Sequence, residues 1–140
     1  MRKGLVLDAN ILIRAVLGVR VRALLEHYED LCEFYSPDVC FVEARRHLPQ
    51  ILGNRGLDAR PALTVLDEIA RLVQPIEPAL YQSFEAVARA RIAPRDLHDW
   101  PVMALALALN LPIWTEDQDF FGSGIATWTT DRVEIYLREG

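Results

Sequence analysis

Short apolar runs alternate with longer amphipathic stretches along this chain. The apolar runs at 4–8, 32–35, 111–115 and 126–129 have the length of β-strands, and the stretches between them repeat apolar residues at helical spacing. Strands that alternate with helices form a parallel sheet covered by helices on both faces. We therefore predict an α/β protein with three layers, α/β/α, and a central parallel sheet of four to five strands.

Helices are expected at 9–17, 21–28, 38–52, 59–73, 78–91, 96–110 and 131–137. The Ala-Leu tract within 96–110 alternates as a strand would, but its length and its strong helix formers favour a helix. Nothing in the composition marks a domain boundary, and 140 residues with 51% hydrophobic content suffice for one sizeable core. We expect a single domain over residues 1–140.

The composition argues against several classes of protein. The longest apolar stretch, at 102–114, is interrupted by polar residues and proline and is too short to span a bilayer. Arg2 and Lys3 precede an apolar run, as in an export signal, but Asp8 breaks that run early, so a cytoplasmic protein is expected. Cys32 and Cys40 show neither CxxC spacing nor companion histidines, and we expect both to be reduced and partly buried.

The formal net charge of -5 argues against a protein that coats nucleic acid nonspecifically, since such binding relies on basic residues. It does not exclude a nuclease, because divalent cations held by clustered acids would present positive charge to a phosphate. All 15 basic residues except Lys3 are arginines. The arginine fork suits phosphate, although ordinary solvated helix faces explain most of these residues better.

Polar residues follow two of the predicted strands. Asp8 and Asn10 come after the first strand, and the strand at 111–115 ends in the group Thr115, Glu116, Asp117 and Asp119. Ligands of open parallel sheets bind outside the carboxyl ends of the strands. If these two strands are neighbours, the polar residues form a site. Taken alone, Asp8 or Asn10 could cap the next helix, and the later acids could spread into solvent.

Further acids lie on predicted helices. Glu43 borders the apolar face of the helix at 38–52, where its carboxylate needs a partner, either a metal ion or Arg46 or His47. Asp96 and Asp99 stand three residues apart at a helix start, where the helix dipole favours acids. Asp99 is therefore either a cap or a ligand, and Asp96 is a cap or a group that supports the ligands.

These acids have one chemical use in common. Hydrolysis of a phosphodiester needs an activated water, a neutralised phosphoryl oxygen and a stabilised leaving group, and divalent cations held by carboxylates supply all three. Mg²⁺ prefers oxygen ligands and suits a site of three or four acids. The chain contains no Walker A sequence, no GxSxG and no GxGxxG, and its histidines lack metal-ligand spacing.

The motifs LDANIL, VEARRHL, DxxDWPVMALALAL and PIWTEDQDF occur in this order. They resemble those of PIN-domain ribonucleases, particularly the VapC-like toxins of toxin-antitoxin pairs, and the resemblance covers essentially the whole chain. It implies catalytic, metal-binding roles for Asp8, Glu43, Asp99 and Asp117. Asn10 and Thr115 match the family's supporting polar positions, and we add Asp96 and Asp119 as supporting residues.

The resemblance also implies a PIN-like fold, an endoribonuclease activity that depends on Mg²⁺ or Mn²⁺, homodimerisation and inhibition by a small antitoxin protein. The sequence departs from the family pattern at two places. Trp100 and Pro101 replace the small residues usual after the third acid. In the last motif Glu116, Asp117 and Asp119 compete for the ligand position, and Asp117 is chosen by its place in the motif.

Three other functions compete with this interpretation. An RNA-processing PIN nuclease would have no antitoxin gene beside its own. A PIN-like binding module that has lost catalysis would show no affinity for divalent metals, and the intact acids argue against it. A haloacid-dehalogenase-like phosphatase would need DxD where this chain has Asp8-Ala9-Asn10.

Overall fold

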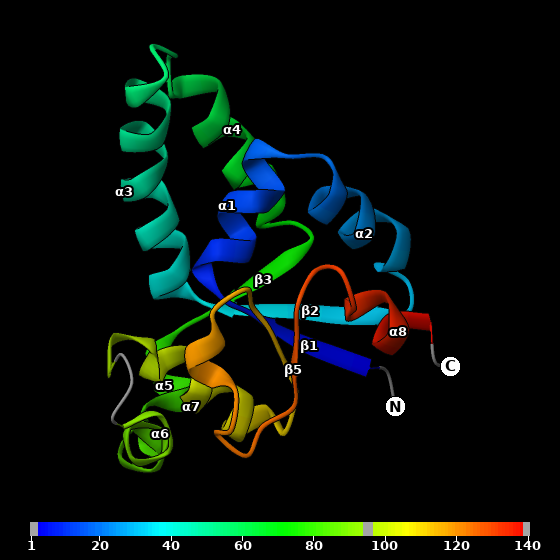
Figure 1. Cartoon of the computed structure of the whole chain (residues 1–140), viewed down its shortest axis with the longest axis vertical. Helices are drawn as coiled ribbons and strands as arrows, with labels where there is room; N and C mark the ends of the chain where they lie inside the picture. The colour runs from blue at the N-terminus through cyan, green and yellow to red at the C-terminus, as the bar shows by residue number, and fades with distance from the viewer. Residues whose placement is uncertain (1–2, 94–96, 139–140) are drawn as a thin grey trace.

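A five-stranded parallel sheet runs through the middle of the computed structural model, which describes residues 3–93 and 97–138 (Figure 1). The strands are β1 Lys3–Leu7, β2 Cys32–Pro37, β3 Val73–Ile76, β4 Ile113–Trp114 and β5 Thr127–Trp128. They lie in the order β3-β2-β1-β4-β5, and each neighbouring pair is parallel. The predicted parallel α/β architecture is confirmed.

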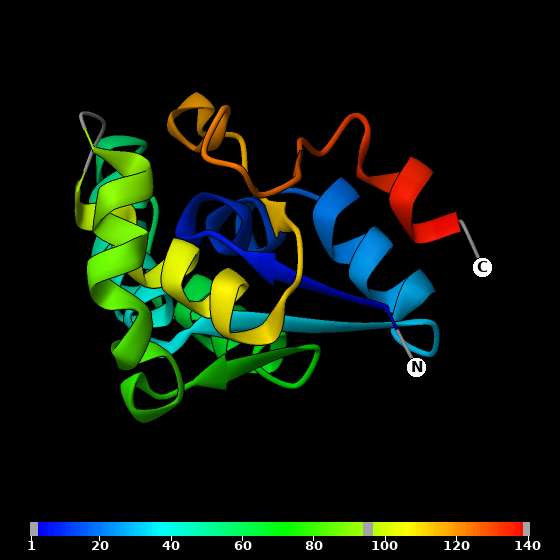
Figure 2. The same cartoon turned by 90° about the horizontal axis from the view of Figure 1, so that it is seen from below.

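Helices form a layer on each face of the sheet. Figure 1 shows α1 Ala9–Leu17, α2 Arg20–Tyr28, α3 Asp38–Asn54 and α4 Arg60–Ile69 on one side, and α5 Pro78–Tyr81, α6 Glu85–Ile92 and α7 Trp100–Leu109 on the other. Figure 2 looks onto the second side, where α7 packs across β1 and β2. The last helix, α8 Val133–Arg138, lies beside α2. A hydrogen bond joins the two helices, in which the Tyr28 hydroxyl donates to the Glu134 carboxylate at 2.7 Å.

The centre of the sheet is its most buried part. Leu5, Val6 and Leu7 of β1 are fully buried, as are most residues at 101–106 of α7. Helix α7 is apolar around its whole circumference, and such a helix is stable only inside a protein. This packing holds the end of β1 rigidly, and the residue that follows it is Asp8.

Strand β3 corrects the prediction of one helix over 59–73. Helix α4 ends at Ile69, and the chain enters the sheet at Val73. The strand escaped prediction because Pro75 interrupts the alternating pattern by which strands are recognised. Proline is tolerated here because β3 lies at the edge of the sheet, where the backbone on one side of the strand has no neighbouring strand to pair with.

Two other predicted helices have different limits. The stretch 78–91 contains α5, a 3-10 turn at Gln82–Phe84 and α6 in place of one helix. Helix α7 begins at Trp100 after a 3-10 turn at Leu97–Asp99, and not at Asp96, which lies outside the described residues. Proline suits this start because Pro101 falls in the first turn, where its missing N–H has no helical partner.

Cys32 and Cys40 form no disulfide within the described residues, as expected, and both are buried rather than partly buried. Among the helices of the described residues, none has both the length and the apolar character needed to traverse a bilayer.

Candidate metal centre

Strands β1 and β4 are neighbours in the sheet, so their carboxyl ends lie side by side. Asp8 follows β1 and Thr115 follows β4. The Thr115 hydroxyl donates to Asp8 Oδ2 at 2.8 Å, although the two residues lie 107 positions apart in the sequence. The two strands that end in polar residues therefore meet at one edge, which is the arrangement that a shared site requires.

Asp8 both caps a helix and belongs to the site. Its Oδ1 accepts a hydrogen bond from the Ala9 backbone N–H at 2.7 Å, at the start of α1. Its Oδ2 accepts from the Thr115 hydroxyl at 2.8 Å and from the Asn10 amide at 3.2 Å. The side chain is held from both sides and only 5% of its surface is exposed. The capping and functional interpretations of this residue are thus compatible.

Three carboxylates converge at this edge of the sheet. One oxygen from each of Asp8, Asp99 and Asp117 lies within 4.8 Å of the other two. Burial raises the pKa of Asp8 from 3.8 to about 6, and the negative charges of Asp117 and Glu43 add to this rise. The hydrogen bonds from Thr115 and Ala9 oppose it. Such a group of like charges is costly unless a proton or a cation neutralises it.

The loop after β4 directs its acids to different places. The Asp117 backbone N–H donates to Thr115 Oγ1 at 2.9 Å, and Asp117 Oδ1 accepts from the Asp119 N–H at 2.9 Å. Glu116 points elsewhere, because its Oε1 accepts from the Thr130 N–H at 2.7 Å. Of the acids in this loop, the structure brings Asp117 into the group of three. Asp119 contributes its backbone amide to positioning Asp117.

Asn10 connects the two sides of the site. Its amide nitrogen donates to Asp8 at 3.2 Å and to Thr115 Oγ1 at 3.3 Å, and its carbonyl oxygen accepts from the Glu116 N–H at 3.2 Å. These bonds tie α1 to the loop after β4. The Asn10 side-chain amide therefore holds the neighbouring acids in position.

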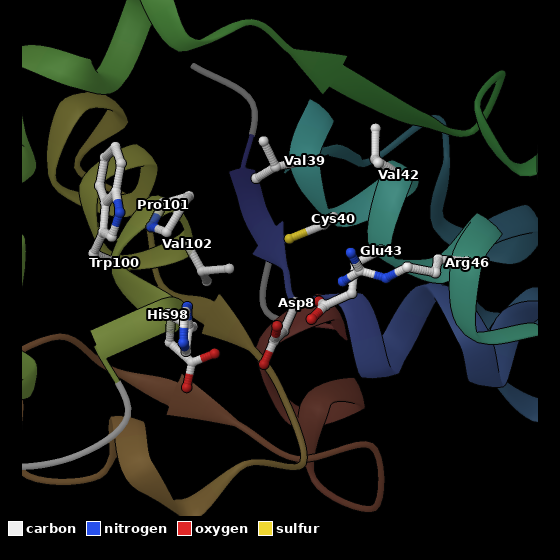
Figure 3. A pocket seen from close by; sticks show the side chains of 11 residues that line it. Asp8, Val39, Cys40, Val42, Glu43, Arg46, His98, Trp100, Pro101 and Val102 are labelled. Carbon is white, nitrogen blue, oxygen red and sulfur yellow. The ribbon is translucent and has the colours of Figure 1, made fainter.

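Two predicted residues lie differently. Glu43 is exposed on α3 and points toward Asp8 in Figure 3, but among the described residues the close group contains Asp8, Asp99 and Asp117 without it. Glu43 borders the site on the side formed by α3. Asp96 lies outside the described residues, so its supporting role stays a prediction.

Two adjoining hollows open beside the acids. The smaller has a volume of about 220 Å³ and is lined by Asp8, Asn10, Glu43, His47, Asp99 and Asp117 with neighbouring apolar residues. The larger is a cleft of about 560 Å³ between α3 and the start of α7 (Figure 3). Asp8, Glu43 and Asp99 line both, so the cleft leads directly to the acids.

The donor set fits a hard divalent cation. The converging ligand atoms are all carboxylate oxygens, which Mg²⁺ and Mn²⁺ prefer. The Asp8 carboxylate is positioned by hydrogen bonds from the Ala9 backbone N–H and from the Thr115 hydroxyl, as ligands of metal sites commonly are. The residues present therefore suit Mg²⁺ or Mn²⁺ better than a softer ion.

The PIN domain family matches residues 6–138 of the chain, which is nearly its whole length. The chain belongs to the PIN-domain family. No curated protein is a significant match to it. The match to the family includes every acid in the site, so the cluster described above is part of the PIN domain itself.

A solved structure shares the fold of this PIN domain. The crystal structure of VapBC2 from Rickettsia felis, bound to a DNA fragment from their promoter, contains a chain that superposes with a TM-score of 0.70. The match covers 90% of this chain and 98% of that chain, at 14% sequence identity. At this identity the likeness establishes the shared fold.

Sequence reasoning missed two residues of this PIN domain that shape the site. Cys40 is buried in the wall of the cleft, and burial raises the pKa of its thiol well above the ordinary value. Its position three residues before Glu43 placed it on the same helix face, and that spacing was available as a signal. Thr130 holds Glu116 through its backbone N–H. No sequence signal predicts that contact.

Replacing Thr115 with Val is expected to lower the free energy of unfolding by about 1–3 kcal/mol. The buried Asp8 carboxylate loses a donor, and the amides of Asn10 and Asp117 lose an acceptor. Affinity for the cation should fall by roughly 10–100-fold, as for other residues that orient ligands. Urea unfolding and metal titration check both effects. Thr115→Ser retains the hydroxyl and should keep the wild-type affinity for the cation; equal affinities of Thr115→Val and Thr115→Ser would contradict this role.

Proposed function

We propose that this PIN domain is an endoribonuclease that uses Mg²⁺ or Mn²⁺ to hydrolyse RNA phosphodiester bonds, and that it is the toxin of a toxin-antitoxin pair. The observation that carries the proposal is the convergence of Asp8, Asp99 and Asp117 within 4.8 Å at the carboxyl edge of the sheet. Membership of the PIN-domain family and the fold shared with a chain of VapBC2 support it.

Asp8, Asp99 and Asp117 would hold the cation, with Glu43 completing this site or helping to hold a second ion. When bound, the cation supplies the positive charge and Lewis acidity that phosphodiester hydrolysis requires. Asn10 and Thr115 keep Asp8 oriented toward the other two carboxylates through their hydrogen bonds. Oriented ligands need little rearrangement when substrate enters, which favours the reaction.

Electrostatics make RNA binding depend on the cation. The chain carries a net charge of -5, and its site contributes several of the acids, so a phosphate approaching the metal-free site is repelled. Arg46 and His98 border the larger cleft, where they can contact the backbone on either side of the scissile bond. Weak RNA binding without a divalent cation follows from this arrangement.

Cleavage of RNA tests the activity directly. The purified protein, freed of any antitoxin that copurifies, is incubated with structured and single-stranded RNAs in Mg²⁺, Mn²⁺ or EDTA. We expect cleavage with either metal and none in EDTA, because the carboxylates alone cannot stabilise the charge that develops on the phosphate. A folded, metal-loaded wild type that cuts no RNA in the panel would contradict the proposal.

The proposal includes a small antitoxin partner and a homodimer. Support for the partner comes from the VapBC2 complex, one chain of which has this fold. Co-expression with the product of a small neighbouring gene should suppress RNA cleavage and yield a stable complex. If the chain still cleaves RNA in the presence of every neighbouring gene product, it would instead be an RNA-processing nuclease. The mass of the purified protein in solution tests the dimer.

A further inference from the structure

Trp100 forms part of the larger cleft, at the position where the sequence departs from the family pattern. Its indole is half-buried and is held by two contacts. The Arg89 guanidinium carbon lies 5.4 Å from the ring centroid, and the Tyr81 ring lies 5.9 Å away at an angle of 59°. The ring therefore has a fixed position in the wall of the cleft, supported from α5 and α6.

Two valines line the same cleft on α3. Val39 and Val42 are 41% and 64% exposed, and Figure 3 shows them across the cleft from Trp100. A single exposed valine needs no explanation. This cleft has apolar side chains on both walls, and one of them is an aromatic ring. Such walls suit a flat apolar group and do not suit a phosphate.

The polar residues of the cleft lie where a nucleotide would need them. Asp8, Glu43 and Asp99 line both hollows, so a phosphate held at the acids places its adjoining nucleoside in the cleft. Arg46 also lines the cleft and suits the next phosphate along the chain. The volume of about 560 Å³ lies within the range of roughly 300–1,000 Å³ typical of small-molecule sites.

We propose that this cleft is a subsite for one unpaired nucleobase next to the scissile phosphate, with Trp100 and Val42 as its walls. The inference rests on the proposed function, because the phosphate at the acids is its anchor. A base inside a duplex has no free face, whereas an unpaired base can stack on an aromatic ring. Trp100 is thus a specificity-determining residue that selects unpaired RNA, while the acids act on the phosphate.

Binding measurements with two probes test this subsite. The first probe is a short single-stranded RNA labelled at one end, and the second is a chain of equal length that lacks its bases. Both are titrated in Ca²⁺ and followed by fluorescence anisotropy. Trp100→Ala should weaken binding of the RNA by about ten-fold or more, since stacking contributes that much per base, and should leave binding of the abasic chain unchanged. Trp100→Phe should retain most of the affinity.

Trp128→Ala is the matched control, because Trp128 is also half-buried but packs on Tyr136, 5.9 Å between ring centroids, and does not line the cleft. It should bind both probes as the wild type does. Equal losses for Trp100→Ala on both probes, or no loss on either, would show that Trp100 only packs against α5 and α6.

A second variant covers the case in which Trp100→Ala does not fold. Val42 is 64% exposed, so Val42→Asp leaves the core intact and puts a charge against the base. It should weaken RNA binding more than abasic-chain binding, and equal weakening would overturn the subsite. Binding needs no cleavage. A protein that binds through Trp100 but cuts nothing contradicts only the proposed function, and one that cuts without any dependence on Trp100 contradicts only the subsite.

Discussion

Asp99→Ala is expected to lower the rate of RNA cleavage by at least about a hundred-fold while the domain stays folded. The substitution removes one of the three carboxylates that would hold the cation, and loss of one group that stabilises transition-state charge commonly costs about 10²–10³-fold in kcat. The fold should tolerate it, because the substitution removes one of three clustered like charges. Cleavage assays and thermal unfolding of the same preparations measure the two effects.

Glu116→Gln is the matched control for this experiment. Glu116 belongs to the same acidic loop as Asp117, but its carboxylate accepts from the Thr130 N–H, and glutamine can accept the same bond. It should cleave RNA as the wild type does. Full activity in Asp99→Ala, or loss of activity in Glu116→Gln equal to that in Asp99→Ala, would refute the assignment of the site.

In the metal-free protein, Asp8 is expected to contribute a loss of stability as the pH rises from about 4 to about 7. The pKa of Asp8 is about 6 in the folded chain against 3.8 ordinarily, chiefly because the group is buried. Between these values the folded state binds more protons than the unfolded state, so the free energy of unfolding falls with pH. Above the folded pKa the fall is complete and is on the order of 3 kcal/mol for this group.

A divalent cation should reverse this loss. At pH 7 the ion neutralises the ionised group and stabilises the folded state by mass action, whereas at pH 5 it must displace the proton of Asp8. Mn²⁺ should therefore raise the Tm more at pH 7 than at pH 5. Urea and thermal unfolding in EDTA and in Mn²⁺ provide the comparison, and Asp8→Asn should flatten the pH dependence. Equal shifts at both pH values would rule out Asp8 as the coupled group.

Local patterns in the sequence sufficed for much of the fold. The alternation of apolar runs with amphipathic stretches predicted β1, β2, β4 and β5 and most of the helical segments between them, because both periods arise from neighbouring residues. The polar residues after β1 and β4 indicated a site at one sheet edge, since parallel strands end at the same edge. The edge strand β3 was missed because Pro75 breaks the alternating pattern within it.

The sequence alone could indicate that Asp8 and the acids near 116–119 belong to one site, because strand ends are readable from local periodicity. Only the tertiary structure decided that Asp117 joins Asp8 and Asp99 while Glu116 turns away. That choice depends on hydrogen bonds between distant segments, such as those of Glu116 with Thr130 and of Thr115 with Asp8. The same holds for the cleft at Trp100, whose walls come from two helices that only folding brings together.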